Sequence, residues 1–190
     1  MEAFLVSAGL VAIAEIGDKT MLLAILLAAT WRRPVPILLG IFVATILNHA
    51  LAAGLGALLG VWLEGPWVKW VLGLGFLACA GWALVPDKLE DGEGRPAPGE
   101  KTAWGVFAAT AVAFFLVEMG DKTQVSTAVL GARFPLEVVW VAAGTTIGMM
   151  IANTPAVLIG EAAATKLPLK YIRWAAALGF AATGVWVLLS

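Results

Sequence analysis

This chain of 190 residues contains one cysteine, one histidine and one tyrosine, and only 13% of its residues are charged. The single Cys79 has no partner for an intrachain disulfide, which excludes a disulfide-stapled fold. The net charge is −1 and no basic run occurs, so we expect no nucleic-acid partner. Thiolate and imidazole ligands are nearly missing as well, which argues against a site for soft metal ions.

Apolar residues dominate what is present. Hydrophobic residues make up 61% of the chain, and the mean hydropathy is +0.93. Stretches long enough to span a bilayer lie at about 3–30, 36–62, 68–86, 103–131, 137–160 and 171–189. The first residues carry Glu2 and no basic segment, so we expect no cleavable signal peptide. The sequence predicts an all-α, polytopic membrane protein with six transmembrane helices and the lipid bilayer as its main partner.

One charged hexapeptide occurs twice inside these apolar stretches, as Glu15-Ile16-Gly17-Asp18-Lys19-Thr20 and as Glu118-Met119-Gly120-Asp121-Lys122-Thr123. An ionised side chain at the centre of a membrane helix costs about 2.5–3.5 kcal/mol. The two motifs together would therefore cost about 15–20 kcal/mol if nothing compensated their charges. We expect that something neutralises, hydrates or uses them.

The two motifs belong to two related halves of the chain. Five motif residues recur after 103 positions, and Trp70, Gly75, Phe76 and Trp82 recur after 104. A polar linker, residues 87–102, separates residues 1–86 from residues 103–190. A repeat of three spans is odd, so its second copy must enter the membrane from the opposite side. The sequence therefore predicts two inverted three-helix repeats with the substrate between them.

Basic residues outside the hexapeptides predict the orientation. The first, third and fifth loops hold Arg32, Arg33, Lys88, Arg95, Lys101, Lys166, Lys170 and Arg173. The opposite side holds only Lys69 and Arg133. By the positive-inside rule, the linker is cytoplasmic and both termini lie outside.

The acids of each hexapeptide lie three residues apart, so Glu15 and Asp18 share a helix face, as do Glu118 and Asp121. Inverted symmetry brings both pairs together. Four carboxylates and two lysines leave a local charge near −2, which a divalent cation would cancel. Oxygen ligands suit hard ions such as calcium, magnesium or manganese. The two asparagines that match between the halves, Asn48 and Asn153, are candidates for further carbonyl oxygens.

Glycine at the third motif position leaves two interpretations open. Gly17 and Gly120 weaken a helix and favour a break that exposes backbone carbonyls to an ion, or they allow close helix packing. Thr20 and Thr123 point about 140° away from the glutamates on a continuous helix. They are ligand candidates only if the helix breaks; otherwise each hydroxyl bonds back to its own helix.

The lysines also have two interpretations. Each follows its glutamate by four residues, so Glu15 with Lys19 and Glu118 with Lys122 would form ion pairs within one helix. Such pairs leave Asp18 and Asp121 without a partner and do not require the duplication. We therefore favour lysines that hold an acid ready and compete with the ion.

Two copies of E-x-G-D-K-T on three-span repeats resemble the GDT1 family of cation/proton exchangers, and the likeness covers essentially the whole chain. The resemblance implies exchange of manganese or calcium for protons, without a prosthetic group and without enzymatic activity. It implies that Glu15, Asp18, Glu118 and Asp121 form the ion site. It also implies a cytoplasmic central loop and, because the chain is compact like prokaryotic members, a place in the cytoplasmic membrane.

As a mechanism, we expect crowded carboxylates to take up protons when the cation leaves, while the two repeats rock against each other. No Walker A pattern occurs, which fits a gradient-driven process. A passive cation channel stays open as an alternative, and an intramembrane aspartyl protease built on Asp18 and Asp121 is a remote one. His49 has Thr154 at its equivalent position, so symmetry does not support it as a proton relay. Glu161 is given only an interfacial or gate-side position.

Overall fold

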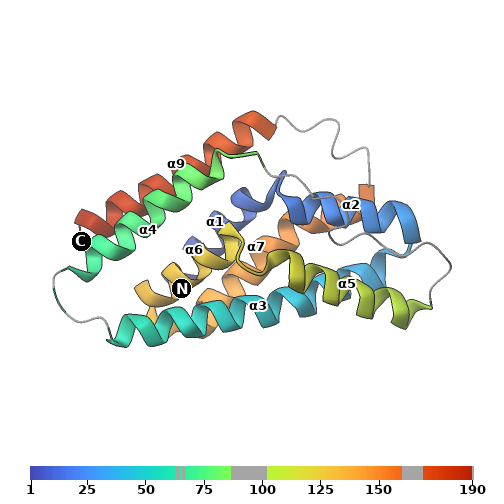
Figure 1. Cartoon of the computed structure of the whole chain (residues 1–190), viewed down its shortest axis with the longest axis horizontal. Coiled ribbons are helices and arrows are strands. Elements are labelled where there is room, and N and C mark those ends of the chain that lie inside the picture. Colours follow the sequence, from blue (N-terminus) through green and yellow to red (C-terminus); the bar gives the residue numbers. More distant parts are fainter. Residues whose placement is uncertain (63–64, 66, 87–101, 160–168, 190) are drawn as a thin grey trace.

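A computed structural model describes residues 1–62, 65, 67–86, 102–159 and 169–189. All regular structure in these residues is helical, which confirms the all-α prediction. The elements are α1 (Glu2–Glu15), α2 (Lys19–Trp31), α3 (Pro34–Trp62), α4 (Val68–Ala83), α5 (Ala103–Glu118), α6 (Lys122–Arg133), the short 3₁₀ helix η1 (Pro135–Glu137), α7 (Val138–Ile159) and α9 (Leu169–Leu189) (Figure 1). Within a bilayer, helices satisfy the backbone hydrogen bonds that lipid cannot.

Two of the predicted spans are each divided into two helices. The stretch predicted at about 3–30 forms α1 and α2, and the stretch at about 103–131 forms α5 and α6. The second pair is bent by 72° at its break. Both divisions fall inside the repeated hexapeptide. The glycine of the motif therefore marks the end of a continuous span.

Among the described residues, helix length and composition support three or four membrane crossings, fewer than the six that the apolar pattern predicts. Three helical segments are long and apolar enough to cross a membrane alone, namely Pro34–Trp62, Pro135–Ile159 and Lys170–Leu189. The bent pair α5 and α6 makes a fourth if it forms one span, and α2 and α4 are shorter apolar helices. The described chain is thus a polytopic helical one, and the six spans stay a prediction.

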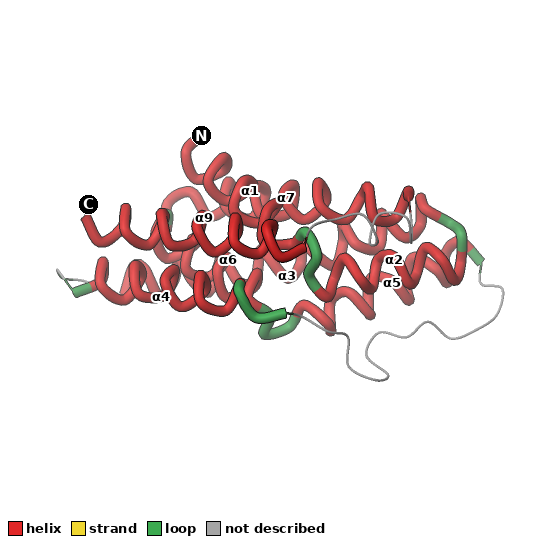
Figure 2. Tube along the Cα trace, turned by 90° about the horizontal axis from the view of Figure 1, so that it is seen from above, coloured by secondary structure: helices red, strands yellow, loops and turns green. Residues whose placement is uncertain are grey.

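Helices of the two halves pack against each other in a reciprocal way. α1 contacts α7, and α5 contacts α3, so the first motif helix of each half lies on the second span of the other half. α3 also packs along α6, while α4 and α9 run side by side at the edge of the molecule (Figures 1 and 2). The two motifs therefore lie in the centre of the molecule.

Matched glycines make two of these contacts close. A Cβ atom on Gly40 would lie 2.8 Å from the carbonyl oxygen of Phe107, and one on Gly144 would lie 2.5 Å from that of Phe4. Gly40 and Gly144 occupy equivalent positions in the two halves, and so do Phe4 and Phe107. The same helix–helix contact is thus made twice, once by each half.

Contacts at the helix ends agree with the predicted grouping of the loops. The amino terminus lies 3.5 Å from Oε2 of Glu137, which places it beside the loop between α6 and α7. Lys69 and Arg133, the two basic residues predicted on that side, line one cavity of about 380 Å³. Arg32 lines a different cavity with Ile159, where the first loop meets the end of α7. The linker 87–101 and Glu161 lie outside the described residues.

Candidate ion-binding site

Both hexapeptides break their helix in the same way. Gly17 has φ 83° and Gly120 has φ 78°, a left-handed conformation that glycine adopts without the steric cost of a side chain. The aspartate that follows, Asp18 or Asp121, is the N-cap of the next helix. A Cβ atom on Gly120 would meet nothing within 4 Å, so close packing does not explain this glycine. Of the two interpretations, the helix break is confirmed.

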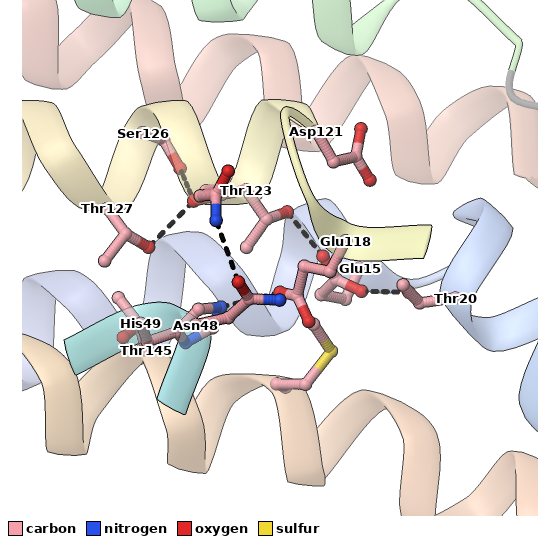
Figure 3. A network of polar contacts seen from close by, with 12 residues as sticks. Glu15, Thr20, Asn48, His49, Glu118, Asp121, Thr123, Ser126, Thr127 and Thr145 are labelled. Atoms are coloured by element: carbon pink, nitrogen blue, oxygen red, sulfur yellow. Dashed lines mark hydrogen bonds and ion pairs between the residues drawn. The ribbon is translucent and has the colours of Figure 1, made fainter. Parts of the chain in front are cut away.

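The break turns both motif threonines toward Glu15, which ends α1. Thr20 of the same motif donates its hydroxyl hydrogen to Oε2 of Glu15, and Thr123 of the other motif donates to Oε1. All three side chains are fully buried. Figure 3 shows Glu15 between the two threonines. The carboxylate of one half is thus held by both motifs.

Lys122 makes the second contact between the motifs. Its ammonium nitrogen lies 2.6 Å from Oδ1 of Asp18, and only 2% of the lysine side chain is exposed. Pairs within one helix would have left Asp18 without a partner, whereas here Lys122 pairs with it. Pairing of Lys122 with Glu118 assumed one continuous helix, whereas the backbone turns at Gly120 between the two residues.

Glu118 meets a residue for which the sequence supported no role. Oε1 of Glu118 lies 2.7 Å from Nε2 of His49, and both side chains are fully buried. His49 comes from α3 in the first half, whereas Glu118 ends α5 in the second half. The only histidine of the chain thus contacts a motif acid, although its equivalent in the repeat is a threonine.

The two matched asparagines have different surroundings. Asn48 donates from Nδ2 to the carbonyl of Phe115 at 3.1 Å and accepts at Oδ1 from Gln124 at 2.9 Å. Gln124 in turn accepts from the backbone N–H of Gly120 at 2.7 Å, so it ties Asn48 to the helix break. Asn153 instead donates to the carbonyl of Met149, one turn earlier in its own helix. The structure therefore connects Asn48 to the second motif directly.

Gln124 was missed in the sequence because it lies just beyond the repeated hexapeptide. Its equivalent in the first half is Met21, whose sulfur accepts from the backbone N–H of Gly17 at 3.4 Å. Both halves thus use the side chain four residues after the glycine to receive the same N–H group. The two halves place chemically different residues, Met21 and Gln124, in the same contact. Comparing the halves for identical residues does not detect this equivalence.

All four motif acids are buried, and two of them lie close enough to a third to repel its charge. Glu15, Asp18, Glu118 and Asp121 are each at most 3% exposed. Glu118 and Asp121 both lie close enough to repel the charge of Glu15. Asp121 accepts at Oδ1 from the N–H of Lys122 at 2.7 Å. In the described part of the chain, no three Asp, Glu, His or Cys side chains already stand together as a metal-binding group. A metal ion would require the acids to draw closer.

Comparison with known proteins places this geometry in a family. A family model described as "Divalent cation/proton antiporter GDT1" matches residues 3–91 and 106–190, which lie one in each half of the chain. A protein of Vibrio cholerae serotype O1 named "Putative manganese exporter" is 49% identical over 173 residues, covering 91% of this chain and 84% of that protein.

More distant relatives occur in plants. "GDT1-like protein 4" of Oryza sativa subsp. indica is 27% identical over 188 residues, which cover 87% of this chain and 66% of that protein. No solved structure matches the chain. Since the family model covers both halves and the bacterial relative nearly the whole length, the chain belongs to the GDT1 family of divalent cation/proton antiporters, which are transporters and not enzymes.

Proposed function

We propose that this protein exchanges a divalent cation for protons across the cytoplasmic membrane, and that its two hexapeptides form a single ion site. In this proposal six transmembrane helices form two inverted three-helix repeats, residues 1–86 and 103–190, joined by a cytoplasmic linker. The repeated glycine contacts at Gly40 and Gly144 support the pseudo-symmetry. The excess of basic residues in the first, third and fifth loops supports the orientation.

The observation that carries the proposal is the pair of contacts between the motifs. Thr123 bonds to Glu15, and Lys122 bonds to Asp18, so residues separated by about half of the chain share one buried cluster. Two motifs that acted independently would be expected to form ion pairs and hydrogen bonds only within each motif. Contacts that cross between the copies instead support one site at the interface of the repeats, where transporters of this architecture bind their substrates.

Charge determines which substrate the cluster suits. Four carboxylates and the two motif lysines sum to about −2, a charge that one bare divalent ion cancels. The ammonium of Lys122 already stands at Asp18, which supports its role as a tethered cation that the arriving ion displaces. The ends of α1 and α5 add the carbonyl groups that a helix leaves without intrahelical partners. Manganese and calcium both accept such oxygen ligands, and the name of the bacterial relative favours manganese.

Proton coupling follows from the same carboxylates. When the ion leaves, crowded acids reduce their mutual repulsion by binding protons, and they release these protons when the next ion binds. The burial of all four acids suits an occluded state between two open ones. Rocking of one repeat against the other would open the site to each side in turn, driven by the proton gradient.

Cation-dependent proton movement in proteoliposomes tests the proposal. Wild type should release protons into the compartment from which Mn²⁺ or Ca²⁺ is taken up. Both Glu15→Gln and Asp121→Asn should abolish this proton movement. Glu137→Gln is the matched control, because Glu137 is a partly exposed carboxylate outside the motifs that contacts the amino terminus. Its exchange should equal that of wild type.

The same assay separates exchange from the alternative of a channel. A channel would pass the cation without a proton gradient and with no stoichiometric proton countermovement. Cation flux without proton release in weakly buffered vesicles, and unchanged by an imposed pH gradient, would contradict the exchange mechanism. Retention of activity in Glu15→Gln or Asp121→Asn would contradict a site shared by both motifs.

A further inference from the structure

His49 of the first half contacts one carboxylate oxygen of Glu118 in the second half. Its Nε2 atom lies 2.7 Å from Oε1 of Glu118, with both side chains fully buried. An ionised carboxylate can only accept hydrogen bonds, so the ring nitrogen is the donor whenever Glu118 is charged. The contact therefore fixes both the position and the rotation of the carboxylate.

The other oxygen of the same carboxylate has no such partner. Oε2 of Glu118 is buried and makes no hydrogen bond within the described part of the chain. Leaving a buried acceptor unsatisfied costs free energy, and more so when the group is charged. Figure 3 shows Glu118 beside Glu15. An oxygen held in this position suits a ligand that arrives and leaves.

Glu15, the equivalent acid of the first half, is held differently. Both of its oxygens accept hydrogen bonds from the motif threonines. The residue equivalent to His49 in the second half is Thr154. Of the two motif glutamates, only Glu118 has one oxygen in contact with a side chain and one oxygen that accepts no hydrogen bond.

We propose that His49 is a positioning residue, which holds Glu118 at Oε1 so that Oε2 becomes a ligand atom for the transported divalent cation. This inference rests on the proposed function and adds to it the ligand atom and the residue that orients it. Carboxylates that bind metals are themselves hydrogen-bonded, and removal of such a partner lowers metal affinity by about 10–100-fold. His49 therefore acts on the ion through Glu118.

Mn²⁺ binding to the purified full-length protein measures this role. His49→Leu removes the donor and should weaken Mn²⁺ binding about 10-fold or more. His49→Gln keeps an N–H donor on a side chain of similar reach and should bind Mn²⁺ within about 3-fold of wild type. Thr154→Val, at the equivalent position of the other half, is the control and should leave binding unchanged. Equal losses in His49→Leu and His49→Gln would overturn the proposal.

A double-mutant cycle separates positioning from a general structural effect. Glu118→Gln removes the acid through which His49 acts, so adding His49→Leu to it should weaken Mn²⁺ binding no further. If the losses from the two substitutions simply add, His49 acts independently of Glu118 and the proposal fails.

A measurement on the wild-type protein avoids dependence on the folding of variants. Because His49 is the only histidine, the ring nitrogens of ¹⁵N-labelled, tag-free protein give one assignable set of NMR signals. Binding of Ca²⁺, which is diamagnetic, should shift these signals. Signals that stay fixed while Ca²⁺ demonstrably binds would overturn the role of His49. A wild type that exchanges no cation for protons would instead refute the proposed function.

Discussion

The ammonium group of Lys122 lies 2.6 Å from Oδ1 of Asp18, although the two residues belong to different copies of one motif and to different halves of the chain. The distance is that of a close ion pair, and both side chains are buried. Lys122 therefore contacts the opposite copy of the motif. This contact supports a role for Lys122 in the site that we propose.

Lys122→Gln is expected to destabilise the protein and to increase its response to cations. Removing one partner of a buried ion pair costs about 3–5 kcal/mol, because the remaining charge is poorly compensated. The site also becomes one unit more negative, so saturating Mn²⁺ should raise the unfolding temperature of the variant more than that of wild type. Fluorescence-detected thermal unfolding in detergent, with and without Mn²⁺, measures both effects. Lys170→Gln, which changes an exposed lysine, is the control; an equal response to Mn²⁺ in Lys122→Gln and wild type would contradict the tethered-cation role.

Gly120→Ala should be destabilising although space for a methyl group exists. The site has φ 78°, and a left-handed conformation costs a residue with a Cβ atom about 1–2 kcal/mol. Gly54→Ala in α3 is the matched control, since a Cβ atom there also meets nothing within 4 Å and the backbone is helical. Gly54→Ala should be neutral or stabilising by up to about 1 kcal/mol. Similar unfolding temperatures for the two variants would show that the helix break at Gly120 is not required.

Alanine at Gly40 and at Gly144 should cause similar losses of stability. Each added Cβ atom would lie less than 3 Å from a backbone carbonyl of the opposite half, and such overpacking costs about 1–3 kcal/mol. Gly9→Ala, where a Cβ atom meets nothing within 4 Å, provides the comparison. Thermal unfolding of the three variants tests the equivalence of the halves. A large loss at only one of the two crowded glycines would argue against matched packing.

Thr123→Val should impair exchange more than Thr123→Ser. Valine has the shape of threonine but cannot donate to Glu15, whereas serine keeps the hydroxyl. A hydrogen bond to a charged group contributes about 1.5–3 kcal/mol, so cation-driven proton flux should fall at least about 10-fold in Thr123→Val. Thr183→Val, which loses a hydroxyl bonded to Gly179 in α9, should keep its flux. Equal fluxes in Thr123→Val and wild type would exclude a contribution of this hydroxyl to the site.

Cation affinity should fall as the pH falls. Protons and the cation compete for the same carboxylates, so each proton released on binding raises the apparent Kd by up to about 10-fold for each unit of decreasing pH. Titrations of Mn²⁺ binding between pH 8 and pH 6 measure this dependence in the absence of a membrane. A Kd that does not change with pH over this range would contradict proton coupling at the ion site.

The sequence predicted the convergence of the motif acids and the helix breaks, because both depend on a repeated local motif. The duplicated hexapeptide indicated that the acids of both halves come together, and the structure places Glu15 beside Glu118 and Thr123. Glycine at the third motif position indicated a break in the helix, which Gly17 and Gly120 make with positive φ. Both predictions follow from periodicity and from the conformational freedom of glycine, which a single sequence contains.

The partners of the charged groups were harder to predict. Pairing of Lys122 with Glu118 followed from the i, i+4 rule, which holds only on an unbroken helix. His49 and Gln124 have different residues, Thr154 and Met21, at their equivalent positions. The repeat therefore does not indicate a role for them. Their contacts with Glu118 and Asn48 depend on how α3 packs against α5 and α6. Such contacts arise from three-dimensional packing, for which one sequence has no local signal.

The reciprocal packing of α1 on α7 and of α5 on α3 also has a consequence for biogenesis. A nascent chain that has been synthesised only as far as Ala83 contains α1 and α3 but none of the helices that will cover their inner faces. Those faces carry Glu15 and His49, so the early intermediate must keep polar groups in lipid or near the translocon until the second half is inserted. Their partners Thr123 and Glu118 lie on α6 and α5, so the polar centre can form only after the second motif has been translated.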